Sequence, residues 1–197
     1  PVELSVRWFV ALLDSPTWLR ALSNSLVVAG GTSVLSTLIG VTAALGVRRL
    51  GGPFRTVAVS LAVLPLLVPG VIIGVTLLTF FSQFGLQQSY PALVLAHSLW
   101  ATPLTFSVMQ AAFARFDWRQ YEAALDLGAP PVRAFVGVVV PGVRASLVVA
   151  ALVAFIVSLQ EFVMALFLSG PSTRTVPVEA WNSLRQSLDP LVSVVST

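Results

Sequence analysis

The 197-residue chain contains no cysteine and no lysine, and only 10% of its residues are charged. Without cysteine, neither a disulfide framework nor a thiolate metal site is possible. Its lone histidine, His97, also excludes a metal cluster built from histidines. Without lysine the chain lacks the G-x-x-x-x-G-K motif that binds nucleotide phosphates, so it cannot drive itself with ATP by that route. Energy for any work must therefore come from a partner or from a gradient.

Hydrophobic residues make up 56% of the chain, and the charged fraction lies far below the roughly 25% that is usual in soluble proteins. Four stretches are long enough to cross the ~30 Å hydrocarbon layer of a bilayer as helices. They are residues 22–46, 56–82, 88–114 and 145–168. Lipid offers no hydrogen-bond partners, and the alternation typical of barrel strands is absent, so each stretch must be helical. We therefore predict an all-α, polytopic transmembrane helical bundle.

The arginines predict the orientation of this bundle. Seven of the eleven lie in the two loops at 47–55 and 115–144, which fall on one side of the membrane. By the positive-inside rule these loops are cytoplasmic, and both ends of the chain lie on the outer side. Residues 1–21, with Trp8 and Trp18, are then expected to form an outer-face interfacial segment, or an ordinary linker. No basic cluster lies beside aromatic residues, so nucleic-acid binding is not expected.

The loop at 115–144 holds the most patterned polar stretch of the chain. Asp117 and Gln120 have the spacing of a capping box, which predicts a helix that begins at Trp118. Gly128 is expected to end this helix in the left-handed conformation. A second helix is expected to begin at Pro130-Pro131 and run toward Pro141. The first helix has an apolar face opposite its charges, and such a helix fits the groove of a partner protein.

The string EAALDLGAPPVRAFVGVVVP, from Glu122 to Pro141, resembles the EAA loop of the membrane-spanning subunits of binding-protein-dependent ABC importers. Other segments resemble the spermidine/putrescine-type branch of that family: Asn24-Ser25-Leu26, Ala96-His97 with Pro103, Phe116-Asp117-Trp118 and Leu168-Ser169-Gly170-Pro171. The resemblance implies a type I, MetI-like permease fold. It also implies that the helix at 118–127 is the coupling helix that inserts into an ATPase. The residues that this role covers are Tyr121, Glu122, Ala123, Ala124, Leu125 and Gly128.

The resemblance further implies a set of partners in the bacterial inner membrane. These are cytoplasmic ATPase subunits that bind the ATP and Mg, a second permease subunit and an outer solute-binding protein. The chain itself would hold no cofactor and catalyse no bond chemistry. Relatives usually have one span before residue 1 and another where this chain ends. Residues 170–197, where Asp189-Pro190 starts a further helix, are therefore expected to be an outer segment and a truncated span.

A polyamine or a similar small solute is the cargo that the resemblance favours. Iron, thiamine, phosphonate or another small solute is the alternative within the family. From other classes, the alternatives are a gradient-driven secondary transporter, a channel subunit or a structural membrane scaffold. In the branch that the chain resembles, an acidic pair often precedes the end of the last full span, whereas here Gln160 replaces the first acid.

Glu161 carries the only formal charge in the four predicted spans. It continues a face of small residues, Ser146, Ala150, Ala154 and Ser158, that also includes Ala165, so it should point into the bundle. A carboxylate in that position costs free energy unless it is paired with another group or hydrated. Glu161 with Gln160 is therefore a candidate for the substrate path. The alternative is a hydrogen-bonded glutamate that joins two helices.

Weaker candidates for the path are His97 and the stretch from Pro65 to Gly74, which includes Pro69 and Gly70. Prolines and glycines there should bend or interrupt the second span, and irregular backbone is tolerated only where it faces protein or water. A hydrogen-bonded structural histidine and a kink used only for packing are the alternatives. Separately, a ladder of small residues in the first span, Ser36, Gly40 and Ala44, predicts the close approach of a neighbouring helix.

Overall fold

The computed structural model describes residues 14–186, and every regular element in that range is a helix. Most of the predicted interfacial segment and the helix start at Asp189-Pro190 lie outside the described residues. The described chain forms two compact units. The glutamate unit comprises residues 14–32, 68–98 and 155–186, and the loop unit comprises residues 33–67 and 99–154.

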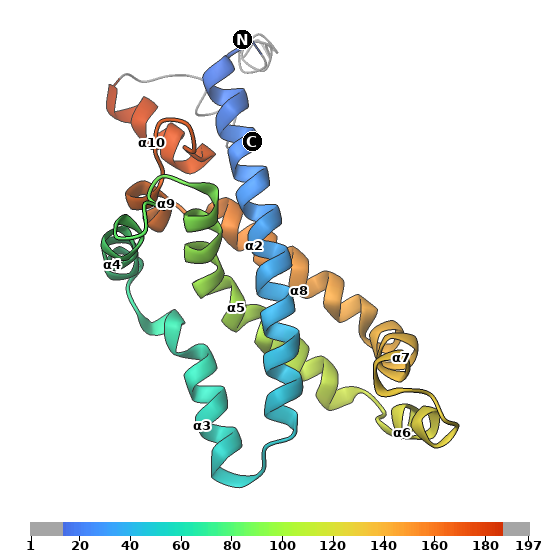
Figure 1. Cartoon of the computed structure of the whole chain (residues 1–197). Helices are drawn as coiled ribbons and strands as arrows, with labels where there is room; N and C mark the ends of the chain where they lie inside the picture. Colours follow the sequence, from blue (N-terminus) through green and yellow to red (C-terminus); the bar gives the residue numbers. More distant parts are fainter. Residues whose placement is uncertain (1–13, 187–197) are drawn as a thin grey trace, which may run out of the picture. The chain divides into compact units, whose positions relative to one another are not determined.

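The helices follow one another along the chain as Figure 1 labels them. They are α2 (Pro16–Arg48), α3 (Gly52–Val63), the 3-10 turn η1 (Leu64–Leu67), α4 (Gly70–Ser82), α5 (Tyr90–Arg115), α6 (Arg119–Asp126), α7 (Pro131–Ala134), the π-helical η2 (Phe135–Val139), α8 (Val140–Gln160), α9 (Val163–Leu168) and α10 (Val176–Gln186). Within residues 14–186, three helical runs are long and apolar enough to cross a membrane, and the pair α3–α4 makes a fourth if it counts as one span.

Helix α2 contains the predicted span 22–46, and α5 covers the predicted span 88–114 except for its first two residues. Helix α2 begins earlier than expected because Pro16 takes its first position, where the missing N–H leaves no hydrogen bond unmade. Residues 16–21 therefore belong to α2. Trp18 is buried and does not lie at the exposed membrane interface that the sequence predicted. Helix α5 tolerates Pro103 in its interior, and the Ser107 hydroxyl donates to the Pro103 carbonyl at 2.8 Å.

The stretch 56–82, expected as one span, is interrupted near its middle. Helix α3 passes into the η1 turn, and α4 begins only at Gly70. Pro69, at the N-cap of α4, has ψ of 132°, which is extended backbone. A proline also disfavours helical backbone in the residue before it, here Val68. The expected bend is thus a full break in the helix.

The second half of the predicted loop at 115–144 is continuous with the last long helix. Helical backbone runs from Pro131 to Gln160 through α7, η2 and α8. The Val140 N–H donates to the Phe135 carbonyl, which is the wider spacing of a π-turn. This widening lies just before Pro141, which lacks an N–H and would crowd the carbonyl of Gly137 in an ordinary α-helix. The π-turn therefore lets the helix continue where a proline would break it.

The stretch 145–168, expected as a fourth uninterrupted span, also divides. Helix α8 ends at Gln160, and the short helix α9 begins at Val163 after Phe162, whose φ is −110°. In the glutamate unit α9 packs against α4, as Figure 1 shows. The two helices approach so closely that a methyl group on Gly74 would come within 2.8 Å of the Phe167 ring. The physical cause of the break lies at Glu161, described below.

In the loop unit, α2 and α5 pack through the small residues that the sequence predicted. Ser36, Gly40 and Ala44 are all buried. The Thr105 hydroxyl donates to the Ser36 carbonyl at 2.7 Å. A methyl group on Gly40 would lie 2.8 Å from the backbone nitrogen of Phe106, which cannot move aside as a side chain could. The expectation of a close helix approach at this ladder is confirmed.

This packing predicts a contrast between two glycines of α2. Gly40→Ala should destabilise the chain by about 1–3 kcal/mol because the methyl group overpacks the contact with α5. Gly46→Ala is the matched control, because Gly46 has open space around it, and alanine there should stabilise the helix by up to about 1 kcal/mol. The measurement is the apparent unfolding temperature of the purified protein in detergent. Equal temperatures for the two variants would contradict the packing.

Candidate functional site

Helix α6 begins one residue later than the sequence predicted, and its start is built differently. The Asp117 carboxylate accepts from the N–H of Arg119 at 3.1 Å. The Gln120 N–H donates to the Asp117 carbonyl rather than to its side chain, at 3.2 Å. Trp118 occupies the N-cap position with helical backbone angles. The predicted capping box is therefore wrong, because the Asp117 side chain reaches a nearer N–H once Trp118 continues the helical turn.

The end of α6 confirms the prediction that Gly128 ends this helix in the left-handed conformation. Its φ is +88°, in the left-handed region that glycine enters at no steric cost. The Gly128 N–H donates to the Leu125 carbonyl at 2.8 Å, and the Ala129 N–H donates to the Ala124 carbonyl at 3.0 Å. These two bonds form a Schellman motif, which satisfies carbonyls that the helix end leaves free. The corner between α6 and α7 is therefore fixed by its own backbone (Figure 1).

One side of α6 packs on the loop unit and the other side is open. Tyr121, Ala124 and Leu125 are half-buried, and α6 packs against α7 and η2. Among the residues that the resemblance assigned to coupling, Glu122, Ala123 and Gly128 are exposed. The predicted set thus divides into an inner group that holds the helix and an outer group that a partner can reach.

Leu127 is an exposed residue of this surface that the sequence analysis missed. Its side chain is 89% exposed, and it lies four residues after Ala123, so the two share a face of the helical turn. Glu122 and Asp126, both exposed, flank this apolar strip on the adjacent edge. A large apolar residue directly before a helix-ending glycine is the signal that would have identified it.

The Glu161 side chain is hydrogen-bonded to the backbone. One carboxylate oxygen accepts from the N–H of Met164 and the other from the N–H of Ala165, each at 3.0 Å. These are donors of the first turn of α9, which otherwise have no partner within the helix. The residue is only 5% exposed. The break between α8 and α9 is therefore stabilised by the carboxylate of the residue that lies in it.

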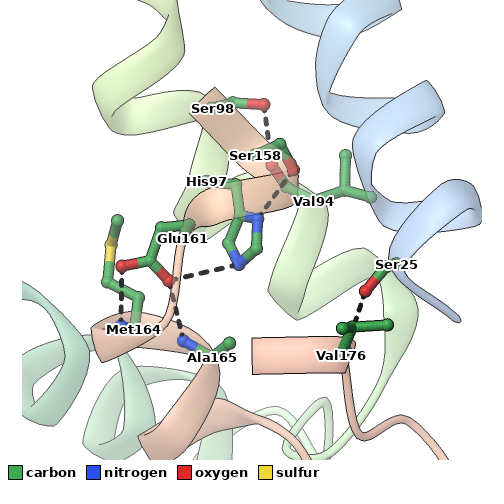
Figure 2. Close-up of polar contacts among 9 residues, drawn as sticks. All are labelled: Ser25, Val94, His97, Ser98, Ser158, Glu161, Met164, Ala165 and Val176. Carbon is green, nitrogen blue, oxygen red and sulfur yellow. Dashed lines mark hydrogen bonds and ion pairs between the residues drawn. The ribbon is translucent and has the colours of Figure 1, made fainter. Parts of the chain in front are cut away.

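His97 on α5 completes a buried polar cluster with Glu161 and Ser158. Its Nδ1 is hydrogen-bonded to the Ser158 hydroxyl at 2.8 Å, and its Nε2 lies 3.5 Å from a carboxylate oxygen of Glu161. Figure 2 shows the imidazole between the two side chains. The sequence did not pair these residues, because no short spacing connects them. This geometry supports the interpretation of Glu161 as a hydrogen-bonded glutamate that joins helices.

The other residues predicted for the substrate path are placed differently. Gln160 is exposed at the last position of α8, while Glu161 is buried, so the two side chains do not act as one pair. Pro69 is exposed at the break before α4, and Gly70 is buried at the first position of that helix. Within residues 14–186, no group of three or more histidine, aspartate or glutamate side chains could hold a metal ion.

Asn24 anchors the segment after α9 in the glutamate unit. Its amide donates to the carbonyls of Ser172 and Arg174, at 3.0 and 2.8 Å, and its oxygen accepts from the Tyr90 hydroxyl at 2.6 Å. The adjacent Ser25 hydroxyl accepts from the N–H of Val176 (Figure 2). The polar residues at the start of the first predicted span thus serve to fix a segment distant in sequence.

The apolar helices, interrupted at a few well-satisfied points and joined by one charged turn, define a polytopic α-helical membrane protein. Residues 36–195 match the family described as binding-protein-dependent transport system inner membrane component, and the chain belongs to that family. The expected role is thereby confirmed: the chain is a membrane-spanning permease subunit of an ABC importer.

Curated relatives and solved structures agree with this assignment. The chain is 30% identical to the putrescine transport system permease protein PotI of Escherichia coli K12, over 98% of this chain and 71% of that protein. It is 24% identical to the spermidine/putrescine transport system permease protein PotC of the same strain, over 98% and 73%. In fold it resembles a chain of a bacterial ABC transporter involved in alginate import, with a TM-score of 0.74 and 16% identity, over 99% of this chain and 77% of that one.

The geometry of Glu161 predicts which amides depend on it. Glu161→Ala removes both acceptors and leaves two buried amides unsatisfied, at about 1–3 kcal/mol each, so the amides of Met164 and Ala165 should exchange with solvent faster. Glu161→Gln retains one acceptor oxygen and should give an intermediate effect. The matched control is Gln160→Ala, which changes an exposed neighbour. Hydrogen exchange measured by mass spectrometry is the test, and unchanged protection of the α9 segment in Glu161→Ala would contradict the assignment.

Proposed function

We propose that α6 is the coupling helix on which a cytoplasmic ATPase subunit rests, and that the chain moves a small solute of the polyamine class inward. The observation that carries this proposal is the open face of α6. Ala123 and Leu127 present an apolar strip there, with Leu127 89% exposed, and the Schellman turn at Gly128 holds the strip rigid. Helices with such a strip bind by laying it in a partner's groove.

The proposed role as a permease with a coupling helix also implies an energy source and a set of partners. The chain has no lysine and hence no phosphate-binding motif, so ATP and Mg belong to the ATPase partner. A second permease subunit completes the path, and a solute-binding protein delivers cargo on the outer side. The arginine-rich loops support a cytoplasmic position for α6, with both ends of the chain outside. A neighbouring fold, with a TM-score of 0.72, comes from an alginate transporter in complex with a periplasmic protein, which supports such docking.

The class of solute rests on the relatives. PotI and PotC are named for putrescine and for spermidine/putrescine. The trehalose transport system permease protein SugB of Mycobacterium tuberculosis is 31% identical over 82% of this chain and 60% of that protein. A sugar is therefore the second candidate that a specific observation favours. The solute-binding protein decides between them, because it selects what reaches the permease.

For the path itself, we assign two kinds of role. Glu161 and His97 set the position of α9, which packs on α4 just after the break at Pro69 and Gly70. These four residues therefore shape the path rather than bind cargo with a free charge. Gln160, exposed at the end of α8, is the polar side chain left available to contact a solute.

The test of coupling uses variants in the assembled transporter. Gly128→Pro cannot adopt the positive φ that the corner requires, and Glu122→Arg reverses a charge beside the apolar strip. Each should abolish most ATP-dependent uptake into proteoliposomes while the subunit remains inserted, and Glu122→Arg should also release the ATPase subunit during affinity purification.

The matched control for backbone strain is Gly85→Pro, since Gly85 also has a positive φ, of +66°, in an exposed turn of the other unit. It should reduce uptake far less than Gly128→Pro does. Normal import by both loop variants would refute the coupling role. Uptake that persists without ATP and collapses with the proton gradient would instead support a secondary transporter.

A further inference from the structure

Trp118 lies at the junction of three helices in the loop unit. It is the N-cap residue of α6, and it directly follows the segment that leaves α5. Its indole N–H donates to the Phe113 carbonyl at 2.9 Å. That carbonyl belongs to the last turn of α5, where no later N–H of the helix can reach it. The side chain therefore closes the end of one helix and begins the next.

The indole ring of Trp118 makes further contacts with one arginine and three aromatic side chains. The guanidinium carbon of Arg48, the last residue of α2, lies 3.5 Å from the centroid of the indole. This is a cation–π contact, and tryptophan is the aromatic residue that binds cations best in this way. The rings of Phe113, Phe116 and Tyr121 lie at centroid distances of 5.8, 5.2 and 6.0 Å from the indole. Trp118 thus touches the ends of α2 and α5 and the first turn of α6 together.

Helix α6 has little other support on this side. None of its eight residues is fully buried. It packs against α7 and η2, which lead into α8. Trp118 and Tyr121 pack against a core cluster that includes Val47 of α2 and Phe113 of α5, so the aromatic group around Trp118 is a route of contact between α6 and the ends of those helices. A displacement of α6 along this route reaches α2 and α5 only if that group stays assembled.

We propose that Trp118 is a positioning residue that joins the coupling helix to α2 and α5, with Arg48 as its partner. Movement of α6 by the ATPase subunit then displaces the ends of both helices as well as α8. This inference rests on the proposed role of α6 as the coupling helix. It assigns to Trp118 and Arg48 a part in force transmission, which is separate from the binding of the ATPase.

The experiment uses the complete transporter in proteoliposomes and records three quantities for each variant: retention of the ATPase subunit, ATP hydrolysis stimulated by the loaded solute-binding protein, and solute uptake. Trp118→Ala should retain the ATPase subunit but lower uptake at least about tenfold, which corresponds to ~1.4 kcal/mol. Uptake per ATP hydrolysed should fall as well. Trp118→Phe, which keeps a ring but loses the bond to the Phe113 carbonyl, should lie between Trp118→Ala and the wild type.

Arg48→Gln and Arg49→Gln form the matched pair, because both remove one exposed arginine charge but only Arg48 stacks on the indole. Arg48→Gln should lower the uptake per ATP, and Arg49→Gln should leave it near the wild-type value. Combining Trp118→Ala with Arg48→Gln should add little to Trp118→Ala alone, since both break one contact.

Two results would overturn the proposal. One is wild-type uptake per ATP in Trp118→Ala. The other is an equal effect of Arg48→Gln and Arg49→Gln, which decides the matter even if Trp118→Ala fails to assemble. Failure of the coupling role itself is recognised separately, because Glu122→Arg would then leave both ATPase retention and uptake intact.

Discussion

The structure depends on one constraint: wherever a helix stops among apolar surroundings, its free backbone groups must find partners, because an unsatisfied group costs several kcal/mol in lipid. The break after α8, the end of α5 and the end of α6 meet this constraint with a specific side chain or turn, whereas the break before α4 has no side-chain cap. Glu161 accepts from the first amides of α9, the indole of Trp118 caps a carbonyl at the end of α5, and Gly128 closes α6 through backbone bonds. The places where the chain turns are therefore determined by these partners.

Turns held in this way are stiff, and stiffness is what a mechanical linkage between subunits requires. Helix α6 has an inner side packed on η2 and an outer strip that ends in Leu127. In the proposed coupling role, the two backbone bonds at Gly128 would oppose unwinding of the corner under a push on the strip. The push would then move the helices behind α6. The same argument in the glutamate unit explains a buried carboxylate as a structural necessity, since it holds α9 against α4.

Sequence reasoning succeeded where the cause is local. The helical class, the close approach at Gly40 and the glycine corner at Gly128 follow from periodicity, residue size and backbone freedom. It failed where the partner is distant in the chain. Nothing near Asn24 indicates that it binds the carbonyl of Ser172, 148 residues away, and no spacing pairs Trp118 with Arg48 or His97 with Glu161. The break after Gln160 was missed for a different reason. The partners of Glu161 are local, but an apolar run is interpreted as one helix until the carboxylate within it is seen to bind the amides of the next turn.

The central claim is that the exposed end of α6 is covered by an ATPase subunit, and the absence of cysteine makes a direct test simple. Leu127→Cys would carry the only thiol of this chain, as would Phe54→Cys, whose native side chain is 74% exposed on α3. In the assembled transporter, a short bifunctional reagent should link position 127 to the ATPase subunit, with a yield that changes when ATP is bound, and should not link position 54. Free reaction of position 127 with a bulky thiol reagent, without any link to an ATPase subunit, would contradict the account.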